Sequence, residues 1–312
     1  MEYNVTIFGI DLVLKPIAFT LPFGNGWDIY WYGIIIATGF LLAMVYGYLN
    51  AKRFNIDTDK MIDVVLVATP CAIIGARAYY LAFDGQKLTS LREFFGFGGS
   101  GFSGLAIYGG VIGALVSGLI MCKVRKVKFL DLVDLASVAF LIGQGVGRWG
   151  NFVNQEAFGA PTGSNFFGMT SENVAREYIK LGYDPTELAH PCFLYESVWC
   201  LVGALIIFLF SKKRRFSGEN ALMYCAWYGF GRAFIELLRT DSLMIGKFRV
   251  SFLISIAISI VALTTFVVIY IRKRKKEKED SYQEMFAIEE ETLETEKTVV
   301  TEEETTDECE EL

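Results

Sequence analysis

Seven long apolar stretches dominate this sequence, and each is about as long as a helix that crosses a lipid bilayer. A helix needs about 20 mostly apolar residues to cross the roughly 30 Å hydrocarbon layer, where it satisfies its own backbone hydrogen bonds. The chain is 53% hydrophobic with a mean hydropathy of +0.38, which is unusual for a soluble domain. The stretches predict an all-α membrane protein with about seven transmembrane helices, at residues 30–49, 61–83, 104–122, 129–147, 191–211, 219–238 and 250–271.

Basic residues follow every second stretch, as in the KKRR run at 212–215 and the RKRKK run at 272–276. Lys and Arg accumulate on the cytoplasmic side of membrane proteins, so this alternation predicts an outside N-terminus and a cytoplasmic C-terminus. Residues 1–29 are then an extracytoplasmic arm, residues 30–271 the seven-span membrane domain, and residues 160–190 a small outer cap.

The last part of the chain differs sharply in charge from the rest. Residues 277–312 hold 16 Asp and Glu against two Lys, whereas residues 1–276 hold 27 Lys and Arg against 19 Asp and Glu. Such a Glu- and Thr-rich segment buries little apolar surface, so residues 272–312 are expected to form a basic stop followed by a disordered acidic cytoplasmic tail. The excess of Lys and Arg in residues 1–276 is explained by cytoplasmic loops that set the topology, and it also suits the binding of an anionic lipid headgroup.

Charged residues interrupt the apolar stretch at 219–238. Tyr228, Arg232, Glu236 and Arg239 follow one another at steps of four, four and three, which puts them on one helical face. An Arg or Glu near the bilayer centre costs about 2.5–3.5 kcal/mol, so this face should point into the bundle or a water-filled cavity. The pattern is explained equally well by a structural Arg232–Glu236 pair and by a functional site.

A second polar group lies in GRWGNFVNQEAFG, residues 147–159, at the end of the fourth stretch. Glycines with exposed N–H groups form anion-binding concavities, and Arg148 can grip phosphate oxygens in a bidentate manner. Asn151 and Asn154 offer further donors. This pattern favours a phosphate site, although a polar loop that caps the helix explains it equally well.

Two more polar residues lie at the ends of stretches. His190 precedes Pro191, which suits a first helical turn, and a structural role for this lone histidine is favoured over chemistry. Tyr108 lies in LAIYGGVIGA, residues 105–114, where Gly109 and Gly113 indicate either close helix packing or an irregular segment that lines a cavity.

Taken together, these motifs resemble one known family. GRWGNFVNQEAFG resembles the signature of the prolipoprotein diacylglyceryl transferases, and LAIYGGVIGA matches a glycine-rich segment of that family. Three further stretches fall in the family's order, namely WYG at 31–33, HPCFLYE at 190–196 and YGFGRAFIELLR at 228–239. The resemblance covers about residues 27–271 and leaves out the acidic tail.

The resemblance implies a bacterial cell-membrane enzyme that moves the diacylglyceryl group of phosphatidylglycerol onto the thiol of a lipobox cysteine in a preprolipoprotein. The products are a thioether-linked lipid and glycerol 1-phosphate. By this resemblance Arg148 and Arg232 hold the headgroup phosphate. The family's functional residues correspond here to Tyr32, Arg148, Asn151, Glu156, Gly159, Tyr228, Arg232, Glu236 and Arg239.

The chemistry requires a base, and the sequence offers several groups for it. Some family members have histidine where this chain has Tyr108, so a histidine base is not expected at that position. Tyr108 and Tyr228 are predicted to polarise the reacting groups, with Glu156 and Glu236 orienting the arginines. Four groups are candidates to assist deprotonation of the thiol, namely Tyr108, Tyr228, His190 and Glu156, so the base itself stays unassigned.

Other classes of protein fit the sequence less well. A transporter for an anionic solute would also bury arginines, but the duplicated halves typical of transporters are not evident. A non-catalytic assembly factor leaves the Arg, Asn and Glu residues without a purpose. We expect no metal, no cofactor and no nucleic-acid partner, because the chain has one histidine and its basic clusters lie at span ends.

Overall fold

The computed structural model describes residues 2–22, 26–83, 106–242, 244–246 and 248–310, with the backbone alone at 284 and 287–310. The chain divides into two compact units, Met1–Ala262 and Leu263–Leu312. The first unit is a helical bundle with short strands at one end. The second continues the last helix of the chain.

Long helices occupy the predicted stretches. Within the described residues, six helical segments are long and apolar enough to cross a membrane. This confirms a helical membrane protein. The long helices are α1 (Trp31–Asn50, extended by the 3-10 turn Ala51–Phe54), α2 (Thr58–Phe83), α4 (Ile107–Arg125), α5 (Phe129–Asn154), α7 (Cys192–Ser211), α8 (Glu219–Leu238) and α9 (Val250–Glu310).

Helix α8 is the exception among the seven predicted spans. Its bounds match the predicted stretch 219–238, but it is not one of the six segments that are apolar enough to cross a membrane. Arg232 and Glu236 lower its hydropathy, and α8 packs against α5 and α7. Seven membrane crossings therefore stay a prediction.

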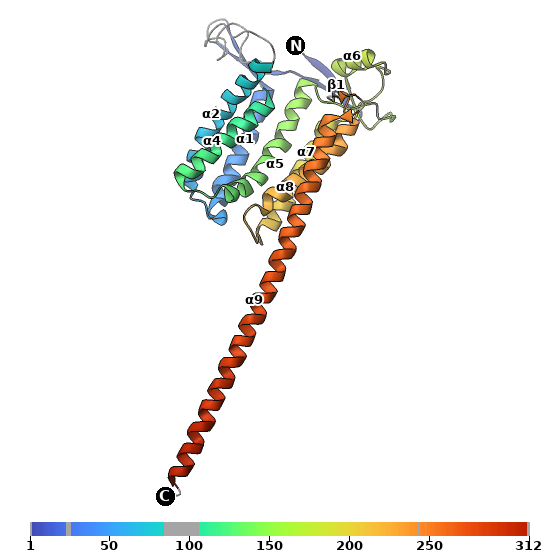
Figure 1. Ribbon diagram of the computed structural model, residues 1–312. Coiled ribbons are helices and arrows are strands. Elements are labelled where there is room, and N and C mark those ends of the chain that lie inside the picture. The colour runs from blue at the N-terminus through green and yellow to red at the C-terminus, as the bar shows by residue number, and fades with distance from the viewer. Residues whose placement is uncertain (1, 23–25, 84–105, 243, 247, 311–312) are drawn as a thin grey trace. The chain divides into compact units, whose positions relative to one another are not determined.

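Small residues set the closest contacts between helices. Helices α2 and α4 lie side by side (Figure 1). A Cβ atom added at Gly109 of α4 would meet the Gly75 carbonyl oxygen of α2 at 2.2 Å. The close packing predicted at Gly109 and Gly113 is confirmed. Helices α7 and α8 are joined by two stacked indoles, because Trp199 and Trp227 each donate a 2.9 Å hydrogen bond to the backbone oxygen of the other.

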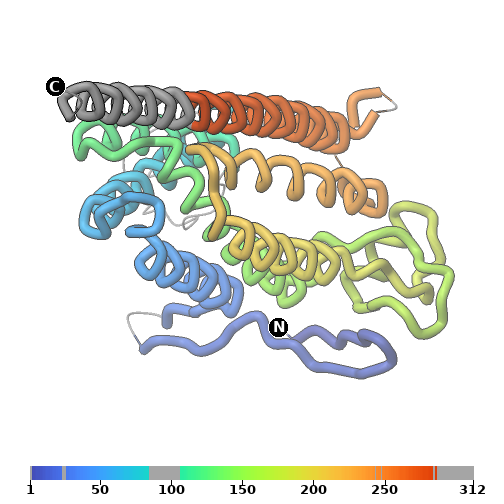
Figure 2. The backbone as a smooth tube through the Cα atoms, turned by 90° about the horizontal axis from the view of Figure 1, so that it is seen from below, coloured from blue at the N-terminus to red at the C-terminus, as the bar shows by residue number. Residues whose placement is uncertain are grey.

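The N-terminal arm forms strands that the helical pattern does not reveal. They are β1 (Tyr3–Ile7), β2 (Ile10–Leu14), β3 (Ile17–Leu21) and β4 (Trp27–Tyr30). The order β2-β1-β5 is antiparallel throughout and includes β5 (Met169–Ser171), with Val5 opposite Ser171. Figure 2 shows this blue hairpin near the segment that carries β5 and α6 (Glu172–Leu181). Strands β3 and β4 pair with each other, as do β6 (Met244–Ile245) and β7 (Phe248–Arg249).

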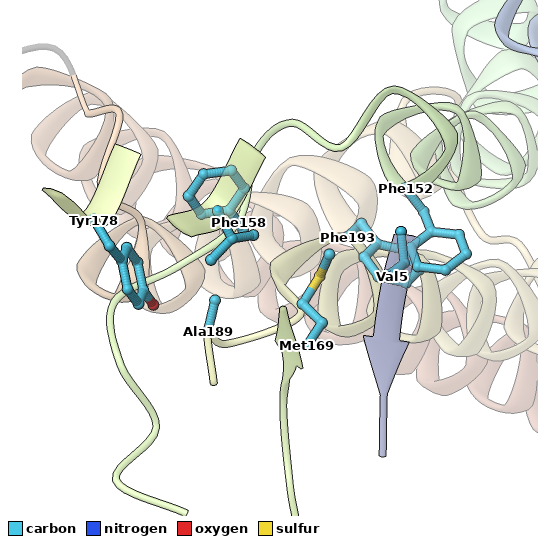
Figure 3. Packing of buried hydrophobic residues seen from close by; sticks show 8 residues of the cluster. Val5, Phe152, Phe158, Met169, Tyr178, Ala189 and Phe193 are labelled. Carbon is cyan, nitrogen blue, oxygen red and sulfur yellow. The ribbon is translucent and has the colours of Figure 1, made fainter. Parts of the chain in front are cut away.

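A small hydrophobic core joins these strands to the helix ends. Val5 of β1 and Met169 of β5 pack with Phe152 of α5 and Phe193 of α7 (Figure 3). The two phenylalanine rings stack with centroids 4.7 Å apart. Residues 160–190 thus belong to the same core as the arm, and their role as an outer cap stays a prediction.

Two expectations differ from the structure. Residues 148–154 continue helix α5, so the predicted concavity of glycine N–H groups is wrong, because N–H groups inside a helix bond to the carbonyl one turn earlier. The acidic tail was expected to be disordered, yet α9 runs without a break to Glu310. Glu and Lys are strong helix formers and residues 250–310 contain no Gly or Pro, so a segment without a core of its own still forms a helix.

Candidate active site

A buried carboxylate at the start of α7 links three helices. The Glu196 side chain is 2% exposed, and its Oε1 lies 2.5 Å from Arg148 Nη2 of α5. The same oxygen accepts a 3.0 Å hydrogen bond from the Tyr228 hydroxyl of α8, and Oε2 accepts a 3.4 Å bond from Arg232 Nη1. We call the set Arg148, Glu196, Tyr228, Arg232 and Glu236 the Glu196 cluster.

Helix α8 contributes three members of this cluster from one face. Arg232 Nη2 lies 2.5 Å from Glu236 Oε2, one turn further along the helix. Tyr228 stacks on Tyr224, whose hydroxyl accepts a 3.1 Å hydrogen bond from Gln144 of α5. The spacing of four that the sequence shows therefore does bring these groups together. The structural pair proposed from sequence exists, and Arg232 also contacts Glu196.

The end of α5 adds a chain of side-chain contacts that leads outward from Arg148. Arg148 Nη1 donates to Asn151 Oδ1 at 3.3 Å, and Asn151 Nδ2 donates to Glu156 Oε1 at 2.8 Å. Gln155 ends the helix in the left-handed region, with a φ of 54°, and this turn brings Glu156 back towards Asn151. Asn154 is half-buried in the last turn of the helix. Arg148, Asn151 and Glu156 therefore form one connected set, and its functional role stays a prediction.

Gly159 lies where there is no room for a side chain. A Cβ atom at this position would meet His190 Cβ at 2.7 Å and the Leu238 carbonyl oxygen at 2.8 Å. Its N–H donates to the His190 carbonyl at 2.9 Å, and its own carbonyl accepts the Tyr178 hydroxyl at 2.9 Å. Gly159 therefore ties the segment after α5 to the start of α7 and the end of α8.

Arg239 and His190 both have protein partners in the structure. Arg239 makes a bidentate contact with Asp241, at 2.8 and 2.6 Å. Burial alone would raise the pKa of Asp241, but the Arg239 guanidinium outweighs it and holds that pKa below its usual value. His190 Nδ1 lies 3.0 Å from the Tyr195 hydroxyl, and burial lowers the pKa of the imidazole. The structural reading of His190 is consistent with this geometry.

The two remaining candidate tyrosines differ in their position. The Tyr32 ring covers Gly150 of α5, where an added Cβ atom would lie 2.8 Å from the ring. Tyr108 lies on α4, is 59% exposed, and has its ring 6.2 Å from that of Tyr79. Tyr32 thus flanks the helix end that carries Arg148 and Asn151, whereas the contacts of Tyr108 lie with α2.

Glu196 is not among the site residues predicted from the sequence, although it is the centre of the cluster. The signal was present, because Glu196 is the one charged residue in the apolar stretch 191–211. A buried carboxylate in such a stretch needs cationic partners, and both arginines predicted to bind phosphate supply them. No group of three or more His, Cys, Asp or Glu side chains in the described part of the chain has a metal-binding arrangement.

This arrangement is suited to holding an anion. Two guanidinium groups from different helices converge on one pair of oxygen atoms, and a tyrosine hydroxyl donates to the same place. Guanidinium forks match the oxygen geometry of phosphate as well as that of carboxylate. The cluster can therefore stabilise negative charge that develops on a phosphate group.

Comparison with known proteins identifies the family. The family model described as prolipoprotein diacylglyceryl transferase matches residues 16–268. Among curated proteins, the chain is similar to phosphatidylglycerol–prolipoprotein diacylglyceryl transferase 1 of Clostridium perfringens (strain 13 / Type A), with 41% identity over 268 residues that cover 85% of this chain and 98% of the relative. It is similar to the transferase of the same name, without the number, from Finegoldia magna, with 40% identity over 80% of this chain and 94% of that protein. It also resembles the one from Bacillus cytotoxicus, with 38% identity over 77% and 87%. The chain belongs to the prolipoprotein diacylglyceryl transferase family.

Proposed function

We propose that this chain transfers the diacylglyceryl group of phosphatidylglycerol to a prolipoprotein, and that the Glu196 cluster is where the lipid phosphate is held. The relatives' names give the donor lipid and the acceptor protein, and the family places this bacterial multi-pass membrane protein among the transferases. We take the acceptor atom to be the thiol of a lipobox cysteine. The supporting observation is the convergence of Arg148 and Arg232 on one anionic group.

The reaction needs a leaving group to be stabilised. The cysteine sulfur attacks carbon C3 of the diacylglyceryl unit, a carbon–sulfur bond forms, and the bond from C3 to the phosphate oxygen breaks. The thiol proton is released, and glycerol 1-phosphate departs with one negative charge more than the phosphate had in the lipid. Arginines held in place before the reaction stabilise this added charge without reorganising at the moment of bond cleavage.

The other residues have supporting roles in this proposal. Tyr228 donates a hydrogen bond from its hydroxyl to Glu196, Glu236 orients Arg232, and Asn151 with Glu156 orients Arg148. The remaining predicted residues lie near the same end of the helices, where they line or support the proposed site. They are Tyr32, Asn154, Gly159, His190 and Arg239. A catalytic role for Tyr108 stays a prediction, because its described contacts lie on α2.

We further propose that this end of the bundle faces outward. Basic residues lie at the opposite ends of the helices, including Lys123 and Arg125 in the last turn of α4. The N-terminus would then lie outside and the C-terminal tail in the cytoplasm. In this orientation the site opens on the side where exported prolipoproteins arrive.

The test uses the purified full chain in liposomes of phosphatidylglycerol with a fluorescent lipobox peptide. We expect thioether-linked lipopeptide and glycerol 1-phosphate to form in equal amounts. A peptide with Cys→Ser at the lipobox position and liposomes of phosphatidylcholine are the controls, and both should give no product. Absence of lipopeptide with the matched lipid and peptide would reject the proposal.

A further inference from the structure

Glu196 occupies the position that the lipid phosphate must take. Both arginines proposed to hold the phosphate already contact this carboxylate, one at each of its oxygen atoms. A carboxylate and a phosphate present similar pairs of oxygens to a guanidinium fork. The two anions therefore compete for the same donors.

The structure assigns Glu196 as an exchangeable counter-ion that keeps the two arginines in place between turnovers and displaces glycerol 1-phosphate after each one. This inference rests on the proposed function. Glu196 yields Arg148 and Arg232 to the incoming phosphodiester while it keeps the hydroxyl of Tyr228. It takes the arginines back when the product leaves.

The charge of the cluster supports a role in product release. Arg148 and Arg232 carry two positive charges and Glu196 and Glu236 carry two negative charges, so the four side chains are neutral together. The phosphodiester of phosphatidylglycerol adds one negative charge. A phosphate monoester near neutral pH carries close to two, so the two arginines hold the product more tightly than the substrate, and its release requires a competing anion, which Glu196 supplies.

The free-energy cost of an unpaired buried charge favours the return of Glu196 to the arginines. Its side chain is nearly inaccessible, and a buried carboxylate without cationic partners is strongly destabilising. Glu236 differs, because the ion pairs described for it involve Arg232 alone. Glu236 can keep its partner throughout the reaction, whereas Glu196 cannot.

The test compares Glu196→Gln with Glu236→Gln. Both variants remove one negative charge from the same four side chains, but only the first removes the carboxylate that both arginines contact. For Glu196→Gln we expect the inhibition constant of glycerol 1-phosphate and the KM for phosphatidylglycerol each to fall by about tenfold or more, because a group that binds the arginines competitively is gone. The kcat should fall as well, with a rapid first turnover followed by a slow steady state.

Rapid-quench measurement of lipopeptide against time, at varied phosphatidylglycerol content, gives these values. Glu236→Gln should show no burst and a much smaller change in product inhibition. A raised KM without a burst in Glu196→Gln would mean that Glu196 only supports the fold, and equal effects in both variants would mean that net charge alone matters. Either result overturns the inference. Wild-type protein that fails to lipidate the peptide would instead reject the proposed function.

Discussion

Two clusters of buried charge lie at opposite ends of helix α5, and they are built differently. At its first turns Arg214 Nη1 lies 2.8 Å from both Asp131 Oδ1 and Asp134 Oδ2. Asp134 also accepts the backbone N–H groups of Gly218 and Ala221, at 2.7 and 2.9 Å, and its side chain is fully buried. We call this set, with Ser217 bonded to Asp131, the Asp134 cluster.

In the Glu196 cluster, by contrast, the described contacts of the central carboxylate come from side chains. Its arginines are also somewhat more exposed to solvent than Arg214. The Arg148 and Arg232 side chains are 23% and 16% exposed, against 13% for the Arg214 side chain. Backbone donors cannot leave without unfolding, whereas side-chain donors can turn to a ligand. In our proposal, this difference is what lets the Glu196 cluster bind a ligand, whereas the Asp134 cluster holds the fold.

The largest expected effect comes from removing an arginine of the Glu196 cluster. Arg232→Ala should lower transfer per folded molecule by about 10³-fold, because a preorganised donor to the departing phosphate is lost. It should also lower stability, because buried Glu236 loses the cationic partner described for it. Arg232→Lys keeps the positive charge but loses the guanidinium fork, so it should retain Glu236 pairing and recover only part of the rate. Release of glycerol phosphate from phosphatidylglycerol liposomes measures both. Near-normal release by Arg232→Ala would contradict the proposed role of Arg232.

The matching substitution in the Asp134 cluster should lower the stability of the protein. Asp134→Asn leaves Arg214 without one of its buried partners, and breaking a buried pair in this way costs about 3–5 kcal/mol. We expect a lower unfolding temperature of the detergent-solubilised protein, with unchanged turnover per folded molecule. A loss of turnover at full stability would show that the two clusters do not differ as described.

A smaller effect is expected from the contact that brings α7 to α8. An added Cβ atom at Gly231 would lie 2.1 Å from the indole nitrogen of Trp199, which follows Glu196 by one turn. Gly231→Ala should therefore lower stability by about 1–3 kcal/mol through overpacking and reduce transfer by shifting Glu196 from Arg232. Gly118→Ala is the matched control, because nothing lies within 4 Å of the added atom there. Equal effects of the two substitutions would show that the indole contact has no special role.

Much of the architecture could be predicted because its causes are local. Membrane crossing depends on the composition of about 20 neighbouring residues, and the helices follow the apolar stretches closely. The shared face of Tyr228, Arg232 and Glu236 follows from helical spacing alone. These parts of the candidate site needed no knowledge of the fold.

The rest depends on contacts between distant residues. Strand β1 pairs with β5 more than 160 residues away, and neither strand is longer than five residues, so no periodic pattern marks them. Glu196 was visible as a single charge, but its role follows from three helices meeting around it. Sequence spacing within one helix cannot show such a meeting.

The smallest expected effect concerns the pH dependence of stability at the start of α7. Burial lowers the pKa of His190 from its usual value of 6.5, so the unfolded chain binds a proton there more readily than the folded protein does. As the pH falls below 6.5 towards the lowered pKa, the free energy of unfolding should therefore fall, by about 1.4 kcal/mol for each unit of difference between the two pKa values. His190→Gln lacks the titrating group and should lose this slope.

Thermal unfolding of wild type and His190→Gln between pH 7.5 and about 5 measures the difference. Asp134→Asn is the control at the other end of the bundle, since its His190 is intact and the slope near pH 6 should persist. If Asp134→Asn rather than His190→Gln removed the slope, the pH response would originate in the Asp134 cluster, and the end of the molecule with backbone-locked charges would be the one that changes with proton concentration.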